Sequence, residues 1–214
     1  MLQRIIVFAR YPEPGKTKTR LIPAIGPEKA AALQRFLAEH VLSVIKTWGA
    51  RRSVSVEVRY EGTDETCMTE WLGSGFVYNV QRGADIGEKM HNAFEDAFNE
   101  QFDRVVIVGT DLPFLDSEIL ESALNLLITH DLVLGPANDG GYYLVGLKAP
   151  EPELFRNVAW GTDLVLDQTV HAASSLGMTP GFVRALDDVD RPEDLQKLKS
   201  LSEFVRNPAF QGLL

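Results

Sequence analysis

Four basic residues gather in one short loop near the start of the chain. The segment 10–20 reads RYPEPGKTKTR and contains a single acid, Glu13. Two prolines and Gly15 restrict the backbone there, which indicates a shaped loop, although solvated surface charges are the competing interpretation. The loop lacks the spaced glycines of the dinucleotide fingerprint and the first glycine of the Walker motif. We therefore expect side chains to bind a phosphate here, and the basic ones are Arg10, Lys16, Lys18 and Arg20.

Asp111 follows the strongest strand signal of the chain, VVIV at 105–108. Ligands of open α/β sheets bind at the carboxyl ends of the strands, so we expect this carboxylate at the same sheet edge as the basic loop. Mg²⁺ or Mn²⁺ is commonly held between one or two carboxylates and substrate phosphates. Asp111 is thus a candidate metal ligand and catalytic residue, with a turn or capping role before Pro113 as the alternative.

A second acidic cluster, Asp187, Asp188 and Asp190, precedes a predicted helix start. Asp190 is a candidate second metal ligand. It also fits a capping box in which Asp190 caps the helix and Glu193 reaches back to the backbone. Both roles can hold at once, because a carboxylate has several lone pairs.

Two glycine-bearing loops add candidate ligand contacts. Gly83 and Gly87 lie where a predicted strand leads into a helix N-terminus, a position that favours anions. Asp139, Gly140 and Gly141 follow another strand, and paired glycines allow a substrate to approach the backbone closely. A tight hairpin explains Asp139 to Gly141 equally well without a ligand.

The elements that must position these residues alternate between strands and helices. Apolar residues at three- and four-residue steps predict a long helix from 27 to 48, with shorter helices near 86–98, 117–127, 162–176 and 192–201. Strands are expected at 5–9, 54–60, 76–80, 105–108, 131–135 and 142–147, with a short extended stretch at 180–183. This alternation predicts a single α/β domain over 1–214 in which helix layers cover a mostly parallel sheet.

Composition narrows the classes of function. Twenty-one basic against 30 acidic residues give a net charge of −9, which disfavours nucleic-acid and anionic-membrane binding. No apolar run is long enough to span a bilayer, and the N-terminus lacks a signal-peptide pattern, so we expect a cytoplasmic protein. Cys67 is the only cysteine, which excludes disulfides within the chain. Whether the chain forms a homodimer stays open.

Four segments together resemble the bacterial GT-A-like glycosyltransferases, which look related to phospholactate and molybdenum-cofactor guanylyltransferases. They read FARYPEPGKTKTRL at 8–21, GTDLP at 109–113, LGPANDGGYYL at 134–144 and DVDRPEDL at 188–195. The resemblance implies the nucleotide-diphospho-sugar transferase fold, a Rossmann-like α/β/α sandwich. It also implies phosphate contacts from Lys16, Lys18 and Arg20, and a divalent metal on Asp111 and Asp190. The single Asp111 departs from the Asp-x-Asp pair of many glycosyltransferases, and Arg191 stands where Thr is common.

Three functions follow from these residues. The first is metal-dependent glycosyl transfer from a nucleoside diphosphate sugar to a small-molecule acceptor, with Asp111, Lys18 and Arg20 stabilising the departing diphosphate. The second is nucleotidyl transfer from a nucleoside triphosphate to a phosphorylated acceptor, which the number of loop cations favours. The third is a non-catalytic nucleotide-sensing domain, because a fold alone does not establish catalysis.

Overall fold

The computed structural model describes residues 1–50 and 52–210. Among these residues, seven strands form one sheet in the order β3-β2-β1-β4-β6-β5-β7. The strands are β1 (Gln3–Arg10), β2 (Val54–Glu61), β3 (Val77–Val80), β4 (Arg104–Val108), β5 (Leu132–Pro136), β6 (Tyr142–Leu147) and β7 (Gly181–Phe182). The α-helices are α1 (Ile22–Ile25), α2 (Pro27–Gly49), α3 (Glu65–Leu72), α4 (Ile86–Asn99), α5 (Ser117–Leu126), α6 (Val165–Ser175) and α7 (Ser202–Arg206), and the 3₁₀ helices are η1 (Pro152–Phe155), η2 (Pro192–Ser200) and η3 (Pro208–Phe210).

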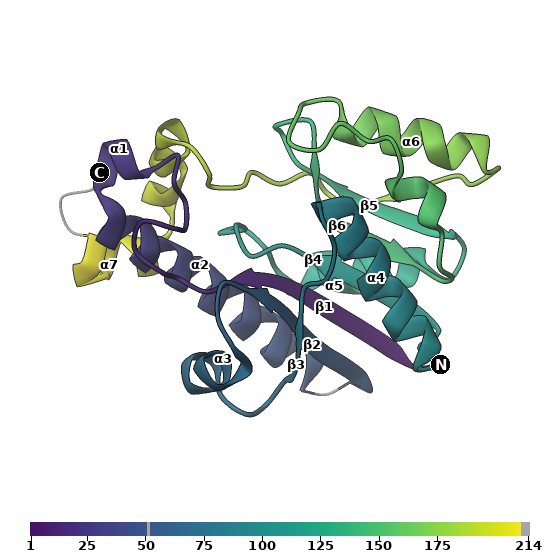
Figure 1. Cartoon of the computed structure of the whole chain (residues 1–214), viewed down its shortest axis with the longest axis horizontal. Coiled ribbons are helices and arrows are strands. Elements are labelled where there is room, and N and C mark those ends of the chain that lie inside the picture. Colours follow the sequence, from purple (N-terminus) through teal and green to yellow (C-terminus); the bar gives the residue numbers. More distant parts are fainter. Residues whose placement is uncertain (51, 211–214) are drawn as a thin grey trace.

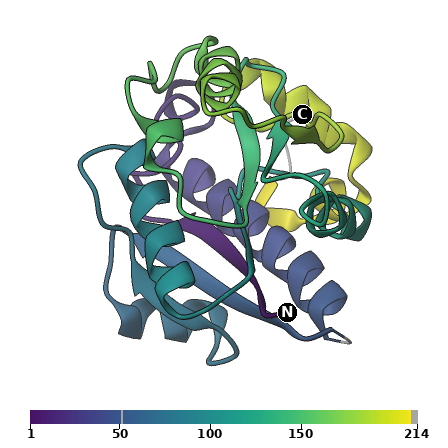
Figure 2. The same cartoon turned by 90° about the vertical axis from the view of Figure 1, so that its right-hand side faces the viewer.

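Helices cover both faces of the sheet, as the alternating pattern predicts. On one face, α2, α3 and α5 pack against a cluster that includes Ile5, Val7 and Val106. On the other face, α4, η1 and α6 pack against Ile6, Val105 and Leu134. Figures 1 and 2 show α2 and α4 on opposite sides of β1. Successive residues of β1 thus point into different cores, which explains its continuous apolar sequence.

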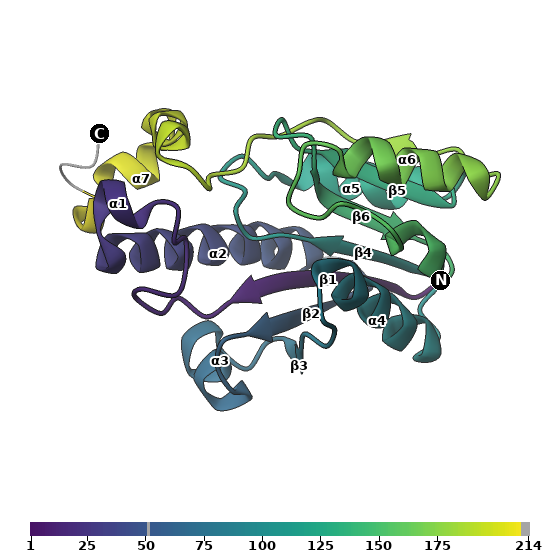
Figure 3. The same cartoon turned by 45° about the horizontal axis from the view of Figure 1, so that its top comes forward.

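The sheet is mostly parallel, and this arrangement gathers several loops at one edge. β1 pairs in parallel with β2 and β4, whereas β6 runs antiparallel between β4 and β5. The carboxyl ends of β1, β4 and β5 therefore lie at the same edge. The basic loop, the segment after β4 and the turn 137–141 all leave the sheet there, as Figure 3 lets the reader follow.

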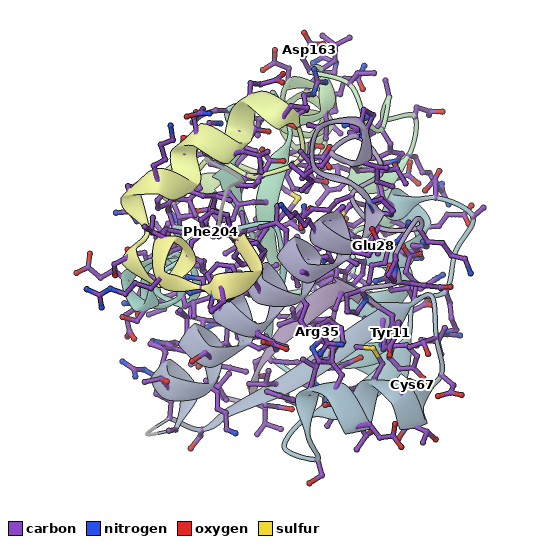
Figure 4. The ribbon with its side chains drawn as sticks, turned by 90° about the vertical axis from the view of Figure 1, so that its left-hand side faces the viewer. Tyr11, Glu28, Arg35, Cys67, Asp163 and Phe204 are labelled. Atoms are coloured by element: carbon purple, nitrogen blue, oxygen red, sulfur yellow. The ribbon has the colours of Figure 1, made fainter. Side chains whose placement is uncertain are left out.

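The C-terminal segment packs beside the first half of α2. Leu195, Leu198 and Phe204 form a third cluster with Leu33 and Leu37, and Figure 4 shows Phe204 in this segment next to α2. The expected helix at 192–201 is instead the 3₁₀ helix η2, followed by the short α7. Among the described residues, no helix has the length and apolar character that crossing a bilayer requires.

The polar face of β2 is buried rather than solvated. Glu57 is fully buried and contacts two arginines, with Oε2 3.0 Å from Arg4 and Oε1 2.6 Å from Nε of Arg59. Asp96 of α4 lies 2.8 Å from Arg59. The alternation of polar residues in β2 therefore marks an internal ion-pair network that ties α4 to the sheet.

Replacing Glu57 by Gln tests this network. The change removes one negative partner from each of two buried guanidinium groups. The free energy of unfolding should therefore fall by about 3 kcal/mol in urea denaturation. Glu153→Gln is the matched control, because Glu153 pairs with Arg156 on the surface and should cost less than about 0.5 kcal/mol. Equal costs for the two variants would contradict a structural role of the network.

Candidate active site

Lys18 joins three distant parts of the chain. Its Nζ lies 2.9 Å from Oδ1 of Asp111 and donates to the carbonyl oxygen of Val189 at 2.6 Å. The Lys18 side chain is only 2% exposed, whereas that of Asp111 is 39% exposed. The backbone N–H of Val189 in turn donates to the carbonyl of Asp111 at 3.0 Å. The basic loop, the end of β4 and the segment after β7 therefore meet at one point, as predicted for Lys18 and Asp111.

The backbone of the basic loop is shaped to deliver Lys18. Lys18 has φ of 45°, in the left-handed region that a non-glycine residue occupies at a cost in free energy. Its carbonyl accepts from the N–H of Leu21 at 2.8 Å, and Leu21 is fully buried. Thr17 bonds back to the carbonyl of Glu13 at 3.1 Å. The loop is thus a fixed turn anchored in the core rather than a solvated tail.

Arg20 and Asp190 form the second bridge between the basic loop and the C-terminal segment. Their closest atoms are 2.6 Å apart. The predicted capping box is wrong, because Asp194 replaces Glu193: its Oδ2 accepts from the N–H groups of Asp190 and Arg191 at 3.1 and 2.8 Å. The Asp190 side chain is turned toward Arg20, and its role as a metal ligand stays a prediction.

The remaining loop cations also have acidic partners. Nε of Arg10 donates to Oε1 of Glu61 at 2.6 Å, and Lys16 lies 2.8 Å from Glu13. In the sequence, four loop cations stand against one acid. In the folded chain each has a carboxylate partner, although Arg10 shares Glu61 with Lys89, and the loop carries far less uncompensated positive charge than the sequence indicates.

Asp188 is the site residue that the sequence analysis did not single out as a metal ligand. Burial, followed by the nearby carboxylates of Asp139 and Asp111, raises the pKa of Asp188 from 3.8 to about 6. Two carboxylates from other segments of the chain thus disfavour the charged form of Asp188 at the carboxyl edge of the sheet. The signal in the sequence is Val189, an apolar residue inside an acidic run. Val189 is fully buried. Because side chains alternate in an extended segment, the adjacent Asp188 is expected on the opposite side of the chain from Val189.

Two adjoining cavities open over these residues. The first, of about 490 Å³, is lined by the basic loop, Gln34, Glu61, Gln81 and the segment 109–112. The second, of about 720 Å³, lies between the segments 160–165 and 187–197. Residues that line both cavities form their border, and they are Arg20, Ile86, Asp139, Gly141, Tyr142, Asp188 and Asp190. The site therefore has a basic-loop cavity and an aspartate-rich cavity that share one wall.

Three of the candidate glycines lie tightly against other segments of the protein, whereas the charged residues line the cavities. Added Cβ atoms would lie 2.6 Å from the Trp160 indole at Gly87 and 2.7 Å from the Lys89 nitrogen at Gly83. At Gly140 a Cβ would meet the Asp163 carbonyl at 2.2 Å. None of these three, nor Gly15, lines either cavity, whereas Gly141 lines both. These glycines permit close packing of protein segments, and direct phosphate or substrate contact by them stays a prediction.

The donor set fits a hard divalent cation. Asp111 and Asp188 offer carboxylate oxygens, and Mg²⁺ or Mn²⁺ would offset the charge of Asp188, which has no ion pair with a basic side chain among the described residues. In the part of the chain that the structure describes, no three His, Cys, Asp or Glu side chains are arranged to hold a metal together. A bound ion would therefore complete its coordination with oxygens from substrate phosphates and water.

Comparison with known proteins confirms the predicted fold. The profile of the family described as "Uncharacterized protein conserved in bacteria (DUF2064)" matches residues 44–162. A crystal structure from Desulfovibrio desulfuricans G20, provisionally assigned as a nucleotide-diphospho-sugar transferase, is 33% identical. It superposes with a TM-score of 0.84 over 97% of this chain and 92% of that one. The resemblance noted from the four sequence segments is therefore correct.

Two curated relatives are named as guanylyltransferases. A 2-phospho-L-lactate guanylyltransferase from Methanocaldococcus jannaschii is 32% identical over 80 residues, only 36% of either chain. A phosphoenolpyruvate guanylyltransferase from Sphaerobacter thermophilus is 24% identical over 184 residues, 85% of this chain and 86% of that one. Glucosyl-3-phosphoglycerate synthase from Mycobacterium tuberculosis, solved with Mn²⁺ and UDP, shares the fold at 15% identity, with a TM-score of 0.54 over 95% of this chain and 77% of that one.

Asp188→Asn tests the cost of the Asp188 charge in the protein without metal, which comes first from burial and then from the neighbouring carboxylates. Because folding raises the pKa of Asp188, the folded state binds more protons than the unfolded state between pH 3.8 and about 6, so wild-type stability falls as pH rises through that window. Above pH 6 the free energy of unfolding of the variant should exceed that of wild type by about 1–2 kcal/mol, a range already reduced for solvent screening. The gain should shrink toward pH 4.

The same variant reports on the metal. Wild type should gain thermal stability when Mn²⁺ and a nucleotide are added, and Asp188→Asn should lose most of that gain. Melting curves with and without Mn²⁺ measure both effects. A variant that is less stable than wild type at pH 7 without metal would show that Asp188 is a structural residue instead.

Proposed function

This chain belongs to the bacterial DUF2064 family, and from the charges at its site we propose that it is a metal-dependent glycosyltransferase that uses a nucleoside diphosphate sugar. The observation that carries the proposal is the convergence of Lys18 and Asp111. A buried ammonium and a half-exposed carboxylate lie 2.9 Å apart at the carboxyl edge of the sheet. They supply the two groups that a metal-bound diphosphate needs: a cation for its oxygens and a carboxylate for its metal.

The charge balance favours a diphosphate over a triphosphate donor. The first cavity is lined by the four loop cations and by five acids, Glu61, Asp111, Asp139, Asp188 and Asp190. A single divalent ion turns this excess of negative charge into a small excess of positive charge. That balance suits the two charges of a nucleoside diphosphate sugar better than the four of a triphosphate.

Each residue has a role that its surroundings support. Lys18 and Arg20 bind and orient the diphosphate, and their bonds to Val189 and Asp190 hold them in place beforehand. When bound, the divalent ion supplies a Lewis acid that stabilises charge on the leaving diphosphate. Asp139 borders the cavities, with Oδ1 accepting from the N–H of Gly141 at 2.9 Å. We assign to it the acceptance of the proton from an acceptor hydroxyl.

The proposed reaction conserves atoms and charge. The acceptor oxygen forms a bond to the anomeric carbon of the sugar while the bond from that carbon to the diphosphate oxygen breaks. The electron pair of the broken bond leaves with the diphosphate. The hydroxyl proton passes to Asp139 and from there to solvent. The products are a glycosylated acceptor and a nucleoside diphosphate.

Nucleotidyl transfer is the second candidate, because the two sequence relatives with defined activities are guanylyltransferases. In that reaction a phosphorylated acceptor attacks the α-phosphorus of a nucleoside triphosphate and pyrophosphate leaves. The same Lys18 and Asp111 would serve, so the two candidates differ in the donor and in the released product. Identifying that product separates them.

Asp111→Asn tests either enzymatic function. The amide keeps the size of the side chain but removes the charge that holds a divalent ion, so Mn²⁺-dependent nucleotide affinity and turnover should each fall by about 10²-fold or more. Calorimetry with Mn²⁺ and a panel of nucleoside diphosphates measures the first effect. Chromatography of the nucleotide products, after incubation with nucleotide sugars and a cell extract, measures the second.

Asp131→Asn is the matched control, since Asp131 pairs with Lys148 and precedes β5 at the opposite edge of the sheet. It should bind and turn over like wild type. Release of pyrophosphate from a triphosphate, with no diphosphate from any nucleotide sugar, would replace the first candidate by the second. Nucleotide binding that is unchanged by EDTA and by Asp111→Asn would overturn both.

A further inference from the structure

The aspartate-rich cavity has a chemical character of its own. Besides the residues it shares with the first cavity, it is lined by Trp160, by Asp163 of the loop before α6, and by the acids and bases of the segment 187–197. Its charged lining consists of three basic residues and six aspartates, namely Arg20, Arg191 and Lys197 with Asp139, Asp163, Asp187, Asp188, Asp190 and Asp194.

Most of the positive charge in this lining is already neutralised. Nζ of Lys197 lies 2.8 Å from Asp187 and 2.9 Å from Asp194. Arg20 is paired with Asp190. Nδ2 of Asn138 donates to the same Asp187 oxygen as Lys197, at 2.9 Å. Lys197, with two carboxylate partners, therefore has little charge left for a ligand, and Arg20 is the residue assigned above to the diphosphate of the neighbouring cavity.

Carboxylates without such partners remain on the same wall. Among the described residues, Asp139, Asp163 and Asp188 have no ion pair with a basic side chain, and Figure 4 shows Asp163 at the outer end of the molecule. Among the described cations of this lining, only the exposed Arg191 has no ion pair with an acidic side chain. A second anion brought to this cavity beside a bound diphosphate would meet three unpaired carboxylates against the single unpaired Arg191, and so a net repulsion.

An aromatic surface completes the cavity. Trp160 is half-buried, and its ring lies at 82° to that of Tyr142 with the centroids 6.3 Å apart. The indole packs over Gly87, where any side chain would displace it. A fixed aromatic ring beside hydrogen-bond acceptors suits a molecule with apolar C–H groups and hydroxyl donors.

We infer that this cavity binds the acceptor, and that the acceptor is an electrically neutral, hydroxyl-bearing molecule of the polyol or sugar class. The inference rests on the proposed function of the neighbouring cavity. Carboxylates accept hydrogen bonds from hydroxyl groups, and the Trp160 ring covers the C–H face of the ligand. A phosphorylated carboxylic acid would bring several negative charges to a wall where three unpaired carboxylates face one unpaired cation, and it would offer few hydrogen-bond donors.

The test uses the intact chain labelled with 5-fluorotryptophan. The three tryptophans give separate ¹⁹F signals, and Trp160→Phe identifies the one from the cavity. With Mg²⁺ and a nucleoside diphosphate bound, we expect neutral polyols and sugars to shift the Trp160 signal saturably. Phosphoenolpyruvate and phospholactate should leave it unmoved up to about 10 mM, ten times the usual upper range of KM values.

Charged relaxation probes test the electrostatic premise in the same sample. At low salt, a cationic nitroxide should broaden the Trp160 signal about five-fold more than an anionic nitroxide of equal size. Asp163→Asn should reduce this ratio, and the distant Asp131→Asn should leave it unchanged.

The outcomes separate this inference from the proposed function. Stronger shifts from phosphorylated acids, no shift from any neutral compound, or equal broadening by both nitroxides would overturn the neutral-acceptor inference. None of these results touches nucleotide binding at Lys18 and Asp111. Failure of Mn²⁺-dependent nucleotide binding, measured in the same samples by calorimetry, would instead remove the proposed function.

Discussion

The contact of Lys18 with Asp111 and Val189 is the interaction on which the site depends. One buried ammonium group holds the first loop, the central strand end and the C-terminal segment together. An ion pair of this kind gains free energy only where its geometry is fixed, because both charges lose hydration. The left-handed backbone at Lys18 and the buried Leu21 fix that geometry. The fold thus tolerates backbone strain and lost hydration at Lys18, which is the place where we propose that a phosphate binds.

The cavities follow from how the remaining charges are distributed around this contact. Each loop cation has a carboxylate partner, and of the neighbouring carboxylates of Asp111, Asp139 and Asp188 only Asp111 has a basic partner, Lys18, in the part of the chain that the structure describes. A divalent ion would turn that imbalance into a small excess of positive charge, which a diphosphate would offset. Two sides of one cleft consequently differ in chemistry: one suits a metal-bound diphosphate, and the other suits a neutral ligand.

Much of this was predictable from the sequence, and the exceptions have physical reasons. The buried run of β1, the long amphipathic α2 and the isolated Asp111 have strong local signals, so the fold and the meeting of Lys18 with Asp111 were expected. Partner choice across long sequence distances has no such signal. The pairs of Arg20 with Asp190 and of Arg4 with Glu57, and the importance of Asp188 over its neighbours, appear only once the chain is folded. The η2 segment, with proline at its start, carried helical spacing but not the geometry of an α-helix.

Anomalous diffraction from Mn²⁺ in crystals grown with a nucleoside diphosphate tests the central claim most directly. We expect one strong peak within about 2.5 Å of an Asp111 carboxylate oxygen, with a diphosphate oxygen as a further ligand and Nζ of Lys18 in hydrogen-bond contact with the diphosphate. A nucleotide bound at this edge without metal on Asp111, or bound away from Lys18, would contradict it.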